Sequence, residues 1–236
     1  TSNNNNSLFS SQPAISASGE LTFTPTADAN GSATITVSVS DDGGTAVSGD
    51  DDTSPNQTFT ITVTAVNDEP SFSTNNITVN EDSGSNSTTG WASNLSKGPS
   101  DESGQTLTFT VTNNNNALFS SQPAINSSGT LTFTPASNAN GNTTVTVSLS
   151  DDGGTSNGGD DTFANQTFTI TVTAVNDEPS FTKGSNITVL EDSGASSTTD
   201  WATSISAGPS DESGQTLTFA VSNDNNSLFS SQPAIS

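Results

Sequence analysis

The 236-residue sequence contains no cysteine, histidine, methionine or tyrosine. Because there is no cysteine, no disulfide bond holds the fold together. Because histidine and cysteine are both absent, the commonest general acid–base side chain and the thiol nucleophile are missing. No run of 18 apolar residues is present, so no segment of this sequence is expected to span a membrane as a helix.

Positive charge is almost absent as well. Two lysines oppose 25 aspartates and glutamates, and the net charge is −23. Nucleic acids and anionic membranes need a basic surface, so both are excluded as expected partners. A strongly acidic chain favours cations, above all hard divalent ones. The alternative is that the acidity only keeps an extracellular protein soluble.

What the sequence does contain is a long internal repeat. The text Leu-Phe-Ser-Ser-Gln-Pro-Ala-Ile occurs at residues 8–15, 118–125 and 228–235, so each copy follows the last by 110 positions. Solenoid units are shorter, roughly 20–50 residues, whereas sandwich domains have about this length. We expect a window onto a longer array. Residues 1–69 would be the C-terminal part of one repeat, 70–178 a complete repeat, and 179–236 the N-terminal part of a third.

A proline-containing acidic stretch separates successive repeats. Val-Asn-Asp-Glu-Pro stands at residues 66–70, the first joint, and again at residues 175–179, the second joint. An alternating apolar–polar run precedes each joint and another extended segment follows it. Proline removes a backbone donor, so it marks a break between sheets. We therefore interpret these stretches as joints between domains.

Within the complete repeat, apolar residues alternate with threonine and serine, which is typical of strands with one buried face. The pattern predicts seven strands, at residues 71–80, 88–96, 105–112, 117–125, 130–134, 142–150 and 165–175. The expected inward residues are Ile77, Val79, Trp91, Leu95, Leu107, Phe109, Val111, Leu131, Phe133, Val145, Val147, Leu149, Phe168, Ile170 and Val172. Seven short strands without a helical period indicate an all-β, antiparallel, immunoglobulin-like sandwich.

The acidic residues cluster in the predicted loops. Alternate loops of a seven-stranded sandwich share an end, so loops far apart in sequence meet at a joint. Around the first joint we expect Asn67, Asp68, Glu69, Asp101 and Glu102, with Asp151 or Asp160. Around the second we expect Glu81, Asp82, Asn176, Asp177, Glu178, Asp211 and Glu212. Carboxylate, amide and carbonyl oxygens are calcium ligands, and magnesium demands a stricter octahedron, so we predict Ca²⁺.

The motifs Asn67-Asp68-Glu69-Pro70, Glu81-Asp82-Ser83-Gly84 and Asp101-Glu102-Ser103-Gly104, with their second copies, resemble the tandem cadherin-like repeats of large bacterial surface proteins and adhesins. The resemblance covers the whole chain. It implies a non-enzymatic, extracellular array stiffened by calcium, serving as a stalk, adhesin or surface fibre. It also implies joint ligands at Asn67, Asp68, Glu81 and Glu102. The sequence departs from the family at Ser100, where a loop acid is common.

Two other classes of function remain open. An enzyme is disfavoured because each pair of acids recurs with the repeat, as structural sites do. A carbohydrate- or surface-binding module would use exposed Trp91 and Trp201 or the threonine faces; the alternative is that both tryptophans belong to the core. The expected partners are calcium, other copies of the repeat in a filament, and surface glycans. Neighbouring chains could complete each other by strand exchange, although a continuous polypeptide is the simpler arrangement.

Overall fold

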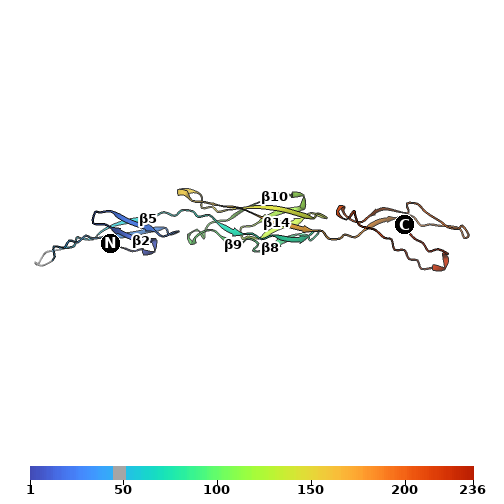
Figure 1. Cartoon of the computed structure of the whole chain (residues 1–236), viewed down its shortest axis with the longest axis horizontal. Helices are drawn as coiled ribbons and strands as arrows, with labels where there is room; N and C mark the ends of the chain where they lie inside the picture. Colours follow the sequence, from blue (N-terminus) through green and yellow to red (C-terminus); the bar gives the residue numbers. More distant parts are fainter. Residues whose placement is uncertain (45–51) are drawn as a thin grey trace.

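The computed structural model describes residues 1–44 and 52–236. Three bodies follow one another in a row, giving an elongated molecule with the central body between the two others (Figure 1). The described residues form strands and short 3-10 turns, and no α-helix occurs among them. This architecture confirms the all-β fold class.

The central body is a sandwich. One sheet has the order β10-β13-β14-β7, a second has the order β11-β12-β8, and β6 pairs with β9. The strands are β6 (Ser71–Ser73), β7 (Ile77–Asn80), β8 (Asn86–Thr88), β9 (Ser93–Ser96), β10 (Thr108–Asn113), β11 (Phe119–Ile125), β12 (Leu131–Pro135), β13 (Gly141–Ser150) and β14 (Thr162–Thr173). Three 3-10 turns connect them: η2 (Ser100–Glu102), η3 (Asn116–Leu118) and η4 (Ser156–Gly158).

The core of the sandwich lies where the alternation predicts it. All fifteen expected inward residues are buried or pack as half-buried side chains against the core, and Val145, Val147 and Ile170 are fully buried. Each large apolar side chain buried in this way stabilises the fold by about 1.5–3 kcal/mol. The threonines between these core residues face outward, so buried and more exposed side chains alternate along β13 and β14.

Trp91 belongs to this core. Its side chain is 4% exposed, its ring centroid lies 4.3 Å from that of Phe168, and its indole N–H donates to the main-chain oxygen of Asn75 at 2.9 Å. A ring held in this way cannot stack on a sugar at the surface. The core interpretation of Trp91 is therefore correct.

Two of the predicted strands are broken in the structure. The first divides into β6 and β7, which lie in different sheets, and the second divides into β8 and β9 on either side of Trp91. The chain changes sheets at the polar residues 74–76, where Asn76 Oδ1 accepts a hydrogen bond from the N–H of Thr169. As a result β7 runs parallel to β14, which departs from the antiparallel expectation for this one pair.

The terminal bodies each hold part of the same arrangement. The N-terminal body contains β1 (Ser2–Asn3), η1 (Asn6–Leu8), β2 (Phe9–Ile15), β3 (Leu21–Pro25), β4 (Gly31–Val37) and β5 (Gln57–Val63). Its small core consists of Leu8, Phe9, Ala33, Ile35 and Ile61. The C-terminal body contains β15 (Ser180–Lys183), β16 (Ala202–Ser206), η5 (Ser210–Glu212) and η6 (Asn226–Leu228).

Candidate functional site

At the first joint, the 3-10 turn η2 directs Glu102 back against the connecting chain. Glu102 is 5% exposed, and its Oε1 accepts a hydrogen bond from the N–H of Asp68 at 2.7 Å. Its other oxygen, Oε2, is buried and has no hydrogen-bond partner. A buried carboxylate oxygen without a partner is costly for the fold, so this atom marks a place where a cation would be stabilising.

The long loop between β13 and β14 folds against the same joint. Asn67 Nδ2 donates to Asp151 Oδ1 at 3.0 Å and to the main-chain oxygen of Asp160 at 2.6 Å. Gln105 Nε2 donates in turn to Asn67 Oδ1. Asp151 is buried, and both its Oδ2 and Gln105 Oε1 lack a partner. The structure thus brings Asp151 and Asp160 to the joint, as the loop argument predicts.

The side chain of Asp101 contacts the N-terminal body across the first joint. Its Oδ2 accepts a hydrogen bond of 2.6 Å from Nδ2 of Asn30, which belongs to the N-terminal body. A hollow of about 220 Å³ lies beside this contact, and Asp28, Asp68 and Asp101 are among the residues that line it. Three carboxylates therefore border one small space between two bodies.

The second joint repeats the contact between the turn glutamate and the connecting chain, and adds Glu81 from the domain before it. Glu212 is 4% exposed; its Oε1 accepts from the N–H of Asp177 at 2.6 Å, and its Oε2 is again buried without a partner. Glu81 is 2% exposed and accepts from the N–H of Val175 at 2.7 Å. Asn140 Nδ2 donates to Glu81 Oε2 at 3.3 Å and to Asp211 Oδ2 at 3.0 Å. Both neighbouring bodies thus contribute to this joint.

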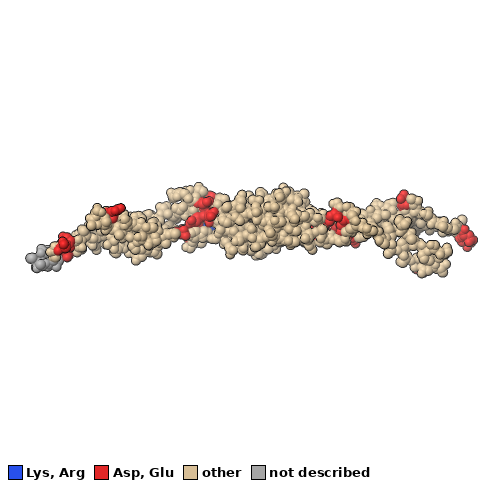
Figure 2. All heavy atoms as spheres, in the orientation of Figure 1, with Lys and Arg blue, Asp and Glu red and all other residues tan. Residues whose placement is uncertain are grey.

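Like charges crowd Asp177. Burial raises the pKa of the Asp177 carboxyl, and the negative charges of four neighbours raise it further; these are Asp82, Glu212, Glu81 and Asp211. One of its oxygens, Oδ2, is buried and unpartnered. Carboxylates also gather at the junctions between bodies in Figure 2, whereas the middle of the central body shows none in that view. Several like charges therefore repel one another at the second joint, where two bodies meet.

Two of the predicted site residues lie apart from these networks. Glu69 and Glu178 are exposed, and neither side chain makes a hydrogen bond within the described part of the chain. Over residues 1–44 and 52–236, no group of three acidic side chains is arranged to hold a metal ion by itself. The oxygens of each joint come from carboxylates, amides and main chain together, not from a compact acidic cluster.

The sequence analysis did not predict that side-chain amides of asparagine and glutamine form hydrogen bonds at the joints. Asn30 and Asn140 stand in Asn-Gly pairs, which predict turns, yet their side chains bind acids on the next body. Gln105 and Gln215 hold Asn67 and Asn176 in the same way at the two joints. The 110-residue recurrence of these amides is the signal that could have found them.

Gly98 makes room for the buried Glu102 side chain, and this gives a first testable prediction. A Cβ at Gly98 would lie 1.7 Å from Glu102 Oε2, and the backbone φ of +115° disfavours any other residue. Gly98→Ala should destabilise the central domain by about 1–3 kcal/mol and lower its melting temperature in thermal denaturation. Gly104→Ala is the control, because nothing lies within 4 Å of its Cβ position. Equal melting temperatures for the two variants would contradict this packing.

The family comparison agrees with this geometry. Residues 66–173 match the family model of the cadherin-like domain, and this segment runs from the first joint to the last residue of β14. No curated protein matches the chain. Cadherin-like domains are typically non-enzymatic adhesion or structural modules, extracellular and generally calcium-binding. In the described residues no helix is long and apolar enough to cross a membrane. The central sandwich of this chain, residues 66–173, therefore matches a cadherin-like domain in its sequence and is all-β, as a cadherin-like repeat is expected to be.

Proposed function

We propose that this chain is a structural segment of a long extracellular repeat protein, a surface fibre, stalk or adhesin shaft, and that calcium at the joints makes it rigid. One observation carries the proposal. The same carboxylate oxygen, Oε2 of Glu102 and Oε2 of Glu212, is buried without a partner at both joints. A fold that repeats such a feature needs something to neutralise it each time, and a cation does so.

The donor atoms fit calcium. Each joint offers only oxygen ligands of hard character, which Ca²⁺ takes in sets of six to eight. The ligands proposed at the first joint are Asn67, Asp68, Asp101 and Glu102, with Glu69 at the exposed rim. Those proposed at the second joint are Glu81, Asp82, Asn176, Asp177, Asp211 and Glu212, with Glu178 at the rim. A bound ion would supply the positive charge that the Asn140 amide supplies only in part between Glu81 and Asp211.

Stiffness follows from where these residues stand. At the second joint, Glu81 and Asn140 belong to the central body, Asp177 to the connecting chain, and Asp211 and Glu212 to the next body. Ligands drawn from both sides of a five-residue connection remove its bending freedom when one ion holds them. We therefore divide the chain functionally at residues 69/70 and 178/179, with the joints as the regulated elements.

Calcium affinity tests the proposal. Replacing both Glu102 and Glu212 by glutamine keeps the shape and removes the charge, so calcium binding measured by titration calorimetry should weaken about tenfold or more, which is 1.4 kcal/mol per tenfold. Glu20→Gln is the matched control, because Glu20 is an exposed acid in the β2–β3 turn. If the double variant binds calcium as tightly as the control does, the joint carboxylates are not the ligands.

Replacing Asp177 should change the melting temperature in opposite directions with and without calcium. Because its pKa is raised in the folded state, the stability it contributes is present below the unfolded-state pKa and is lost as pH rises through the raised pKa. At neutral pH without calcium, the charged form therefore destabilises the second joint. Asp177→Asn should raise the melting temperature in a chelator and lower it in millimolar calcium, relative to the unsubstituted chain.

The control for this reversal is Asp224→Asn. The equivalent position of the central repeat, Asn114, already holds asparagine, so this change should not affect the joint in either buffer. A decrease in melting temperature for Asp177→Asn in both buffers would mean that Asp177 is a partner in the fold itself and not a site of repulsion.

A further inference from the structure

The same hydrogen bond crosses both joints. Asn30 Nδ2 donates to Asp101 Oδ2 at 2.6 Å across the first joint. Asn140 Nδ2 donates to Asp211 Oδ2 at 3.0 Å across the second. In each pair the asparagine belongs to the body before the joint, and the aspartate belongs to the 3-10 turn of the body after it, η2 or η5. Donor and acceptor are 71 residues apart in both pairs, so the contact belongs to the repeat.

Each asparagine is presented by a turn of its own body. The N–H of Ala29 donates to the main-chain oxygen of Thr26 at 3.2 Å in the N-terminal body. The N–H of Ala139 donates to the main-chain oxygen of Ala136 at the same distance in the central body. The glycine after each asparagine begins the next strand with a φ of +121° or +126°, a backbone conformation that favours glycine. The shape of these turns therefore does not depend on the neighbouring body.

At the second joint the connecting chain is attached to both bodies. The N–H of Val175 donates to Glu81 Oε1 of the central body at 2.7 Å. The N–H of Asp177 donates to Glu212 Oε1 of the next body at 2.6 Å. The connection therefore turns over a short stretch around Asn176. So short a connection acts as one point of attachment between the two bodies, and the cross-joint hydrogen bond is a second point.

At the first joint the connecting chain is fixed to the central body. The N–H of Asp68 donates to Glu102 Oε1 at 2.7 Å. The main-chain oxygen of Asn67 accepts from the N–H of Asp160 at 3.0 Å. Residues 64–66, between the end of β5 and these contacts, are then the stretch over which this joint turns. The first joint thus also has one short pivot and one hydrogen bond beside it.

We propose that the Asn30–Asp101 and Asn140–Asp211 hydrogen bonds are latches, each of which turns its joint from a free pivot into a hinge with a single axis when no cation is bound. Two bodies attached at one point rotate about any axis through that point. Attached at two points, they rotate only about the line that joins the points. The closed latch therefore leaves one bending motion at each joint.

The latch is reversible. Both hydrogen bonds are exposed to solvent, where water competes for the amide and for the carboxylate. A hydrogen bond of this kind favours the closed state by about twofold to tenfold. The bodies therefore still move in the absence of a cation, but mostly about the hinge axis. Because the two latches stand at equivalent places, each body bends relative to the next in the same direction of its own frame.

Spin labels on both sides of the first joint test the latch. This joint is the simpler one, because the Asn140 amide at the second joint also contacts Glu81. The chain has no cysteine, so Thr34→Cys and Thr110→Cys, at exposed positions of β4 and β10, each accept one label in the full chain. In a chelator, Asn30→Asp should broaden the distribution of label-to-label distances, because two facing carboxylates remove the roughly twofold to tenfold preference for the closed state.

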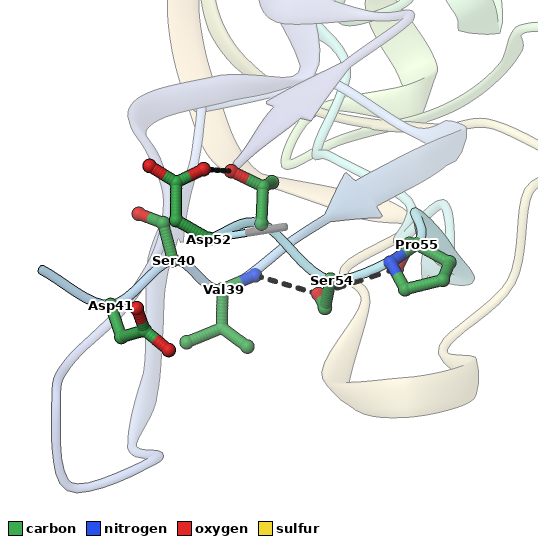
Figure 3. Close-up of a pocket in the computed structure, with 7 residues that line it drawn as sticks. Val39, Ser40, Asp41, Asp52, Ser54 and Pro55 are labelled. Carbon is green, nitrogen blue, oxygen red and sulfur yellow. Dashed lines mark hydrogen bonds between the residues drawn. The ribbon is translucent and has the colours of Figure 1, made fainter. Parts of the chain in front are cut away.

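Exchanging the two latch residues is the decisive variant. Asn30→Asp combined with Asp101→Asn restores one amide and one carboxylate with their places reversed, so the distance distribution should narrow again to that of the unsubstituted joint. Ser54→Ala is the control for a hydrogen bond lost within one body. Ser54 Oγ accepts from the N–H of Val39 at 3.0 Å beside a hollow of the N-terminal body (Figure 3), so this change should leave the distribution as it is.

Two results would overturn the inference. In one, Asn30→Asp leaves the distance distribution as narrow as that of the unsubstituted joint. In the other, the exchange variant stays as broad as Asn30→Asp alone. Both comparisons are made in a chelator, so they do not depend on whether the joints bind calcium. A failure of the latch is therefore distinguishable from a failure of the proposed function.

Discussion

Trp91→Ala should nearly abolish the folding of the central sandwich, whereas the same change at Trp201 should hardly alter the thermal unfolding of the chain. Removing a buried tryptophan costs about 3–5 kcal/mol, and a domain of this size has only about 5–15 kcal/mol of stability in total. At roughly 4–8 °C for each kcal/mol, the melting temperature should fall by about 12–40 °C.

Trp201 is the matched control because it occupies the equivalent repeat position in a different environment. Its indole N–H makes the equivalent bond to the main-chain oxygen of Ser185, but its ring is only half-buried. Equal losses for the two variants would mean that Trp91 stabilises the chain through its local turn and not through packing on Phe168.

Calcium should change the shape of the chain as well as its stability. With chelator, small-angle scattering should report bodies that move about two flexible joints; with millimolar calcium, it should report a rod. Extracellular calcium modules bind with Kd on the order of 10⁻⁴–10⁻³ M, and a tenfold excess of calcium over Kd stabilises a site by about 1.4 kcal/mol. Thermal unfolding should therefore shift upward in the same titration.

The variant with glutamine at both Glu102 and Glu212 is the control for this experiment. When calcium is added, its scattering profile should stay that of the unsubstituted chain in chelator. The reason is that the buried negative charges that would be neutralised by a cation have been removed. If calcium leaves the profile and the melting temperature of the unsubstituted chain unchanged, the chain is an acidic spacer indifferent to calcium.

The sequence predicted the core well because burial in a sandwich follows the two-residue period of a strand. Val145, Val147 and Ile170 could hardly be placed otherwise. The strand prediction was wrong where the alternation of apolar and polar residues is absent. Residues 74–76 are polar throughout, so nothing in them indicates that the chain crosses from one sheet to the other. The parallel pairing of β7 with β14 follows from that crossing and was missed with it.

The candidate site was predicted for a different reason. Strand direction alone brings the loop of Glu102 and the loop of Asp151 to one end of the domain, and the structure joins both to the first joint. What strand direction cannot give is side-chain detail. It did not separate the buried Glu102 from the exposed Glu69, and it did not show that Asn30 crosses the joint to bind Asp101.

The parallel pair of β7 and β14 has a mechanical consequence. The chain enters the central domain just before β6 and leaves it at the end of β14, at the opposite end of the row. Tension along the molecule therefore pulls β7 backward and β14 forward, so the four residue pairs from Ile77–Ile170 to Asn80–Thr173 are loaded in shear. Bonds in shear share the force and must break together, whereas an antiparallel pair pulled from one end unzips bond by bond. Such a pair resists tension at the place where a tether would be pulled.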